Sequence, residues 1–126
     1  MDGKDVFVYR MLLVGRADYL KAHGAEVARV LRALDAATTM IHRQPEAARA
    51  LIASALGVES HTLMPYFEPS DFQLCLDQSL LLALDHQARW AGAKGMLRAG
   101  SAPDYGALLR PEALRAVLPH AVRIVY

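Results

Sequence analysis

Residues 74–90, which read LCLDQSLLLALDHQARW, have the clearest helical pattern of apolar and polar positions in the chain. Apolar residues recur three and four positions apart, and this spacing places them on one face of an amphipathic helix. Asp77 is a favourable N-cap, because its carboxylate accepts hydrogen bonds from the first free backbone N–H groups. Gly95 provides a stop after the last turn. The predicted apolar face consists of Leu80, Leu81, Leu84, Ala88 and Ala91.

The apolar stripe of this helix is wider than a lone surface helix requires. Leu82, Ala83 and Trp90 lie beside the main face, so we expect the helix to contact more than one neighbour. Asp85 and Arg89 stand four residues apart in the stabilising order of acid before base. We interpret them as a solvated ion pair.

Residues 6–14, with the sequence VFVYRMLLV, are rich in β-branched and aromatic side chains. A continuous apolar run of this length predicts a strand that is buried on both faces. Such a strand needs backbone partners, and the other run of similar character is residues 122–125. Residues 72–76 alternate apolar and polar positions, which predicts an extended segment with one face on the core. Strands are therefore expected to be few.

Helical patterns dominate the rest of the chain. Proline at a first helical position and glycine after a last turn mark the ends of several predicted helices. The predicted fold is α/β but mostly helical, a single domain over residues 1–126 with about five helices and one or two strands. The helices are expected at about residues 17–21, 24–42, 45–57, 77–95 and 111–119, with a single helical turn at 60–64.

Composition and charge exclude several classes of protein. The chain is 54% hydrophobic and 21% charged, which is typical of a globular protein rather than a disordered one. Its 14 basic and 13 acidic residues are interspersed, so no basic stripe is present to follow nucleic-acid phosphates. The first residues lack the features of a signal peptide, and no apolar run reaches the roughly 20 residues of a membrane-spanning helix. The sequence as given predicts a soluble, cytoplasmic protein.

Residues with reactive or metal-binding side chains are scattered. No two histidines stand three or four residues apart, the spacing that places two imidazoles on one helical face, so no metal site or other cofactor is predicted. Cys75 is the single cysteine, which excludes an intrachain disulfide. Cys75 and His86 have no evident third orienting group, and structural thiols are commoner than catalytic ones, so the chain is not predicted to be an enzyme. The histidines are His23, His42, His61, His86 and His120.

Three stretches of the chain resemble the C-terminal part of one protein family. The first is VYRMLLVGRADYLKAHGAEVARVLRALDAA, followed by QPEAARALIASALGV. The second is FQLCLDQSLLLALDHQARWA, and the third is PDYGALLRPEALRAVLPHAVRIV, which is similar to a closing helix, proline and short strand. They resemble the substrate-binding proteins of ABC importers for nitrate, sulfonates, taurine and pyrimidines, also called the thiamine-pyrimidine-synthase-like group. The resemblance covers nearly the whole chain from Val6 onward.

This resemblance implies a partial lobe of a periplasmic-binding-protein-like fold. In the family, two α/β lobes close on a small anionic or zwitterionic solute, and the ABC permease reads the closed form in the periplasm. The other lobe elements and a secretory signal are expected upstream of Met1. Tyr9 and Arg10 lie in the strand that returns from the hinge, so they are the candidate ligand-binding residues, and an arginine there meets a carboxylate, sulfonate or nitrate. The alternative is that Arg10 ends in solvent or pairs with Asp5 or Asp18.

Two functions follow from these patterns. By resemblance, the chain is the C-terminal portion of the solute-binding component of an ABC importer. The catalytic segment of the pyrimidine-synthase members lies outside the region of resemblance, so enzymatic activity is not implied. The alternative is a truncated helical module that does not bind solute and acts as a self-association domain. In that homodimer a second copy covers the apolar surface around Leu82 and Trp90.

Overall fold

The computed structural model describes residues 10–98 and 103–125, and 69% of this part of the chain is helical. The mostly helical α/β class predicted from the sequence is confirmed. None of the helices in these two ranges has the length and the apolar character needed to cross a membrane. In chain order the elements are α1 (Ala17–Ala22), α2 (Gly24–Arg43), α3 (Pro45–Leu56), α4 (Ser60–Leu63), η2 (Met64–Tyr66), η3 (Pro69–Asp71), β1 (Leu76–Asp77), α5 (Gln78–Ala93), α6 (Tyr105–Leu108), α7 (Glu112–Val117), η4 (Pro119–Ala121) and β2 (Val122–Arg123).

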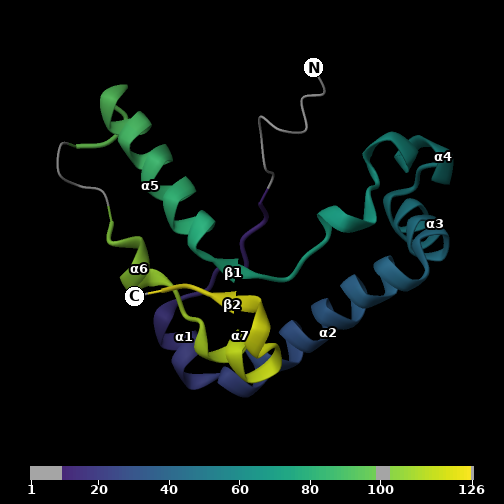
Figure 1. The fold of residues 1–126 in the computed structure, drawn as a ribbon, viewed down its shortest axis with the longest axis horizontal. Coiled ribbons are helices and arrows are strands. Elements are labelled where there is room, and N and C mark those ends of the chain that lie inside the picture. The colour runs from purple at the N-terminus through teal and green to yellow at the C-terminus, as the bar shows by residue number, and fades with distance from the viewer. Residues whose placement is uncertain (1–9, 99–102, 126) are drawn as a thin grey trace.

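The centre of the molecule is formed by the N-terminal half of α2, by α7 and by the sheet (Figure 1). Within residues 72–76 the apolar positions are partly buried and the polar positions are exposed. The extended segment predicted there is confirmed, because its apolar face packs on the core. The buried cluster consists of Leu31, Leu114 and Ala121, with Val27, Leu74, Leu76, Ala113, Val117, Leu118 and Val122 packed against it.

Two helical arms extend from this centre (Figure 1). The C-terminal half of α2 leads to α3 and α4 on one side, and α5 projects on the other side. Among the described residues the buried core is small, and many large apolar side chains remain in contact with solvent.

The ends of the helices follow local signals in the sequence. The Asp77 carboxylate accepts a hydrogen bond from the backbone N–H of Leu80 at 3.3 Å and caps α5. Pro45 is the first residue of α3, and Gly57 follows its last residue with a φ of 68°, a conformation that glycine adopts without strain. Gly95 has a φ of 71° just beyond α5. The predicted starts and stops of α3 and α5 are confirmed.

The sheet is a parallel pair of two-residue strands. Leu76 lies opposite Val122, and Asp77 lies opposite Arg123. β2 confirms a strand within residues 122–125, although it is shorter than predicted. Its partner β1 comes from the end of the extended segment before α5, and not from the apolar run near the N-terminus.

The buried strand predicted at residues 6–14 is wrong for the portion that the structure describes. Residues 10–14 form no strand, and 86% of Met11 and 82% of Val14 is exposed to solvent. An apolar run becomes a strand only where another strand supplies backbone partners, and neither β1 nor β2 pairs with this segment. Residues 6–9 lie outside the described part of the chain.

A short helix, α6, occurs in a region where no helix is predicted from the sequence. The Asp104 carboxylate accepts a hydrogen bond from the backbone N–H of Ala107 at 3.1 Å, and this cap starts the single turn. α6 packs against α5. It therefore supports one side of a helix that otherwise projects away from the centre (Figure 1).

Candidate functional site

Arg10, one of the two predicted ligand-binding residues, lies against the start of α5. Its guanidinium Nη2 donates a hydrogen bond to the Ser79 hydroxyl at 2.6 Å, and that hydroxyl donates to Asp77 Oδ1 at 2.6 Å. The first of these contacts joins residues that are 69 positions apart in the sequence. Tyr9, the other predicted residue, lies outside the described part of the chain. The structure thus connects the N-terminal segment to the α5 N-cap.

The contacts of Arg10 exclude one of its two predicted acidic partners. Arg10 does not pair with Asp18, because the Asp18 carboxylate is bound by Arg16. Asp5, the other predicted acidic partner, lies outside the described residues. The Arg10 side chain is exposed, and its contact with Ser79 engages one of the five N–H donors of a guanidinium. An anion from solution therefore has access to this side chain.

Hydrogen bonds stabilise the ionised form of the Asp77 carboxyl group. The hydrogen bond from the Ser79 hydroxyl holds the pKa of Asp77 below its usual range. The backbone N–H of Leu80 and the charge of Arg10 lower this pKa further, whereas partial burial opposes the shift. The ionised carboxylate is the form that best accepts hydrogen bonds at the helix start, so the main role of Asp77 is to cap α5.

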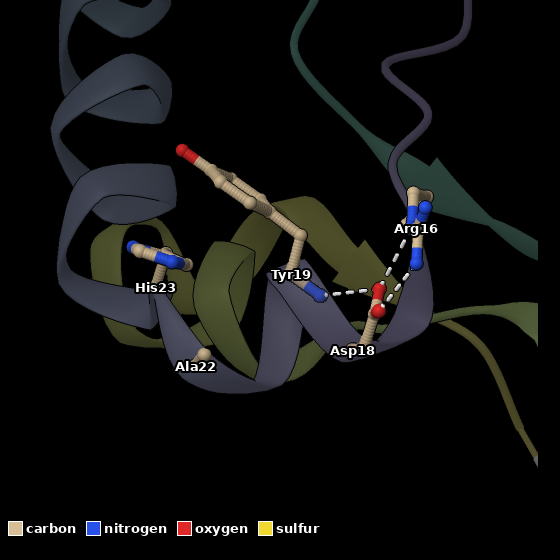
Figure 2. A pocket seen from close by; sticks show the side chains of 5 residues that line it. All are labelled: Arg16, Asp18, Tyr19, Ala22 and His23. Carbon is tan, nitrogen blue, oxygen red and sulfur yellow. Dashed lines mark hydrogen bonds and ion pairs between the residues drawn. The ribbon is translucent and has the colours of Figure 1, made fainter.

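A shallow depression of about 600 Å³ lies at the junction of α1 and α2 (Figure 2). Arg16 donates two hydrogen bonds to Asp18, of 3.1 and 2.6 Å. The rings of Tyr19 and His23 stack with their centroids 4.2 Å apart. The lining residues are Arg16, Asp18, Tyr19, Ala22 and His23.

Glu26 binds both rings of this stack. The Tyr19 hydroxyl donates to Glu26 Oε2 at 2.8 Å, and His23 Nδ1 lies 3.3 Å from Glu26 Oε1. The hydrogen bond with Glu26 raises the pKa of Tyr19, and the contacts with Tyr19 and then His23 lower the pKa of Glu26. The charged groups are thus satisfied within the junction, so its main effect is to join α1 to α2.

A second hollow, of about 280 Å³, lies between α2, the segment before β1 and the C-terminal elements. Several of its polar groups already bind backbone carbonyls: Thr38 Oγ1 donates to Asp35 O at 3.0 Å, and His42 Nε2 lies 2.9 Å from Pro69 O. The first contact lies within α2, and the second holds η3 against α2. The lining residues are Asp35, Thr38, Thr39, His42, Phe72, Gln73, Leu74, Cys75, Leu118, His120, Ala121 and Arg123.

Cys75 is a free, exposed thiol in this second hollow. The hollow also contains His42 and His120, but not His86, the histidine considered with Cys75 from the sequence. In residues 10–98 and 103–125, no three His, Cys, Asp or Glu side chains are grouped so as to hold a metal ion. The hollow therefore brings Cys75 together with His42 and His120 rather than with His86.

The outer face of α5 carries large apolar side chains that are exposed to solvent. Leu82 is 64% exposed and Trp90 is 55% exposed. Asp85 and Arg89 form the predicted ion pair on this helix. Trp90, which the sequence places beside the main apolar face, is therefore not a core residue of the single chain.

The junction between α1 and α2 is the grouping that the sequence analysis missed. Tyr19, His23 and Glu26 are spaced by four and by three residues, so they lie on one side of a helical path. This spacing was a usable signal. By contrast, no local pattern predicts that Arg10 contacts Ser79, because the two residues belong to segments that only the tertiary fold brings together.

Comparison of the chain with models of known protein families, with curated proteins and with solved structures gives no match. Function is therefore inferred from the residues and the geometry of the described part.

Proposed function

We propose that this chain is the C-terminal portion of the solute-binding component of an ABC importer for nitrate, sulfonate, taurine or pyrimidine-type solutes. The resemblance of three long stretches of sequence supports this role. The order of the elements also fits it: a short helix, a long helix and a proline-opened helix precede α5, and a short helix, proline and strand follow. In this role the protein is periplasmic, and an ABC permease recognises its solute-bound form.

The observation that carries this proposal is the small size of the sheet. β1 and β2 pair over two residues, whereas parallel strands are normally found in larger sheets that are covered on both faces. The apolar run at residues 11–14 is exposed as well. Further strands of an α/β lobe would pair with the strand edges that no described strand occupies and would cover this run.

Tyr9 and Arg10 bind the anionic group of the solute in this proposal. The exposed Arg10 guanidinium is fixed by Ser79 at one position, which leaves other N–H donors for an incoming oxyanion. A guanidinium suits carboxylate and sulfonate groups because it donates two parallel hydrogen bonds. The second lobe would supply the opposite wall of the cleft.

The coding sequence immediately upstream of the Met1 codon tests the proposal directly. We expect a continuous reading frame that encodes the remaining lobe elements and a secretory signal. An in-frame stop codon upstream, with a native start codon at Met1, would overturn the proposal, because the same polypeptide would then contribute no second lobe.

Thermal-shift measurements with taurine, nitrate, alkylsulfonates and pyrimidines test solute binding by the chain. A solute that binds only the native state stabilises it by about 2.7 kcal/mol at 100 times its Kd. We expect Arg10→Gln to abolish the shift given by an anionic solute. Arg32→Gln, at an exposed position of α2, is the matched control and should preserve it. The absence of a shift with every solute would contradict binding by this chain.

We propose self-association as a second candidate function. The exposure of Leu82 and Trp90 on a projecting helix favours it, because large apolar side chains that cluster on a surface often mark an interface. Light scattering at micromolar concentration tests this candidate. A monodisperse monomer at such concentrations would contradict it.

A further inference from the structure

Leu82, His86 and Trp90 follow one another at intervals of four residues along α5, and all three are exposed. Residues spaced in this way form a continuous ridge on a helix. This α5 ridge lies on the side of the helix opposite Leu80 and Ala88, its buried residues. The ridge therefore projects away from the surface that α5 uses within its own chain.

The positions along the ridge suit a two-fold axis. In a two-fold interface, residue i contacts residue j of the second copy, and residue j contacts residue i. His86 is midway between Leu82 and Trp90, so an antiparallel pair centred on His86 places each Trp90 against Leu82 of the second copy. Ridges of this spacing interdigitate when the two helices cross at about 50°.

The charges beside the ridge favour the antiparallel orientation. Asp85 and Arg89 lie on one flank of it, whereas Ala83 and Gln87 lie on the other flank. Antiparallel pairing brings the two charged flanks together, with Asp85 of each copy near Arg89 of the other. Parallel pairing instead places each charged flank opposite an uncharged one. Only the antiparallel orientation therefore gains from opposite charges.

We propose that α5 is the interface through which two copies of this chain pair antiparallel, with Trp90 packed on Leu82 of the second copy and His86 nearest the two-fold axis. This inference rests on the second candidate function, self-association. Each copy contributes a single helix ridge, so we expect a small interface and a dimer that dissociates in the micromolar range.

Sedimentation velocity over a micromolar concentration series tests the interface. Leu82→Ala and Trp90→Ala are each expected to raise the dimer Kd about tenfold or more, because each truncation removes both symmetric Trp–Leu contacts. Leu51→Ala removes a leucine of α3 that is similarly exposed, at 62%, and serves as the matched control with an unchanged Kd. Circular dichroism checks that the variants keep their helices.

Charge reversal tests the orientation. In the antiparallel dimer, Asp85→Arg places like charges against Arg89 of the second copy and weakens association. The double variant Asp85→Arg, Arg89→Asp restores opposite charges and the original Kd. In a parallel dimer both variants would leave the Kd unchanged, and that result would overturn the proposed orientation.

A cysteine at the two-fold axis gives an independent readout. In a Cys75→Ser background, His86→Cys is expected to form a disulfide-linked dimer on mild oxidation. Arg32→Cys in the same background places the thiol on exposed α2 and is expected to remain monomeric. A dimer whose Kd is unchanged by the Leu82 and Trp90 substitutions, and which does not crosslink at position 86, would overturn the α5 interface but leave self-association intact. If the parent chain is a monomer at every concentration, both the α5 interface and self-association are overturned.

Discussion

α2 and α5 are both long amphipathic helices, yet they use their apolar residues differently. In α2, Leu31 is buried against Leu114 of α7 at the centre of the molecule. In α5, one side is covered within the chain, but Leu82 and Trp90 on the opposite side remain exposed. Sequence periodicity therefore decides which residues share a face, whereas burial depends on which other element reaches that face.

A leucine-to-alanine substitution in each region gives the largest expected contrast. Leu114→Ala removes a side chain that is 6% exposed, so we expect a loss of about 2–4 kcal/mol in the free energy of unfolding. Leu82→Ala, measured below the Kd of any dimer, should change it by less than about 0.5 kcal/mol. Urea denaturation of both variants measures the difference. Equal losses of unfolding free energy in the two variants would show that Leu82 is as well buried in the monomer as Leu114.

Removal of the α5 N-cap tests how far this arm depends on its own local signals. Asp77→Ala leaves the N–H of Leu80 without its side-chain acceptor, and we expect a loss of about 1 kcal/mol. Asp77→Asn retains an acceptor oxygen and should lose much less. Urea denaturation and far-ultraviolet circular dichroism measure both variants. A loss as large for Asn as for Ala would indicate that the charge, rather than the cap, matters.

The same carboxylate makes the stability of the α5 arm sensitive to acid. Because the pKa of Asp77 is lower in the folded protein, the native state binds fewer protons at this group than the unfolded state. Its contribution is complete above the unfolded pKa of about 3.9 and is lost as the pH falls through the lower folded pKa. The free energy of unfolding is measured as a function of pH for the parent chain and for Asp77→Asn, and the difference between the two profiles isolates this effect. Identical profiles would contradict it.

The smallest expected effect concerns the ion pair on the outer side of α5. Asp85→Ala removes the partner of Arg89, and an exposed pair of this spacing contributes about 0.3–0.5 kcal/mol. Added salt should reduce the difference between the variant and the parent chain, because ions screen exposed charges. A salt-independent loss of more than about 1 kcal/mol would mean that the pair is shielded from solvent.

Much of the helical structure could be predicted because its signals are local. Asp77, Pro45 and Gly57 define helix ends through contacts within a few residues, so the structure agrees with the sequence at each of them. The alternation at residues 72–76 likewise predicted the side of the chain that faces the core.

The remaining features depend on residues that are distant in the sequence. Apolar character alone predicted a strand at residues 6–14, but the described part of this run has no strand partner. β1 was predicted only as an extended segment, because its pairing with β2 joins residues 76 and 122. For the candidate site, the sequence identified Arg10 but not its contact with Ser79. Local sequence signals thus predict where helices begin and end. The packing partners of each element depend on the tertiary fold.

The pairing of β1 with β2 also closes a loop in the chain. Leu76 and Val122 are the ends of this loop, which contains α5, α6 and α7. Closing a flexible loop of about 46 residues costs on the order of 3 kcal/mol in chain entropy. Two strand residues on each side do not offset this cost alone, but Leu76 and Val122 also pack against the buried cluster that contains Leu31 and Leu114. We therefore expect the loop to close and the central core to form in one cooperative step. Because β1 directly precedes α5, the same step anchors the start of α5 to the core.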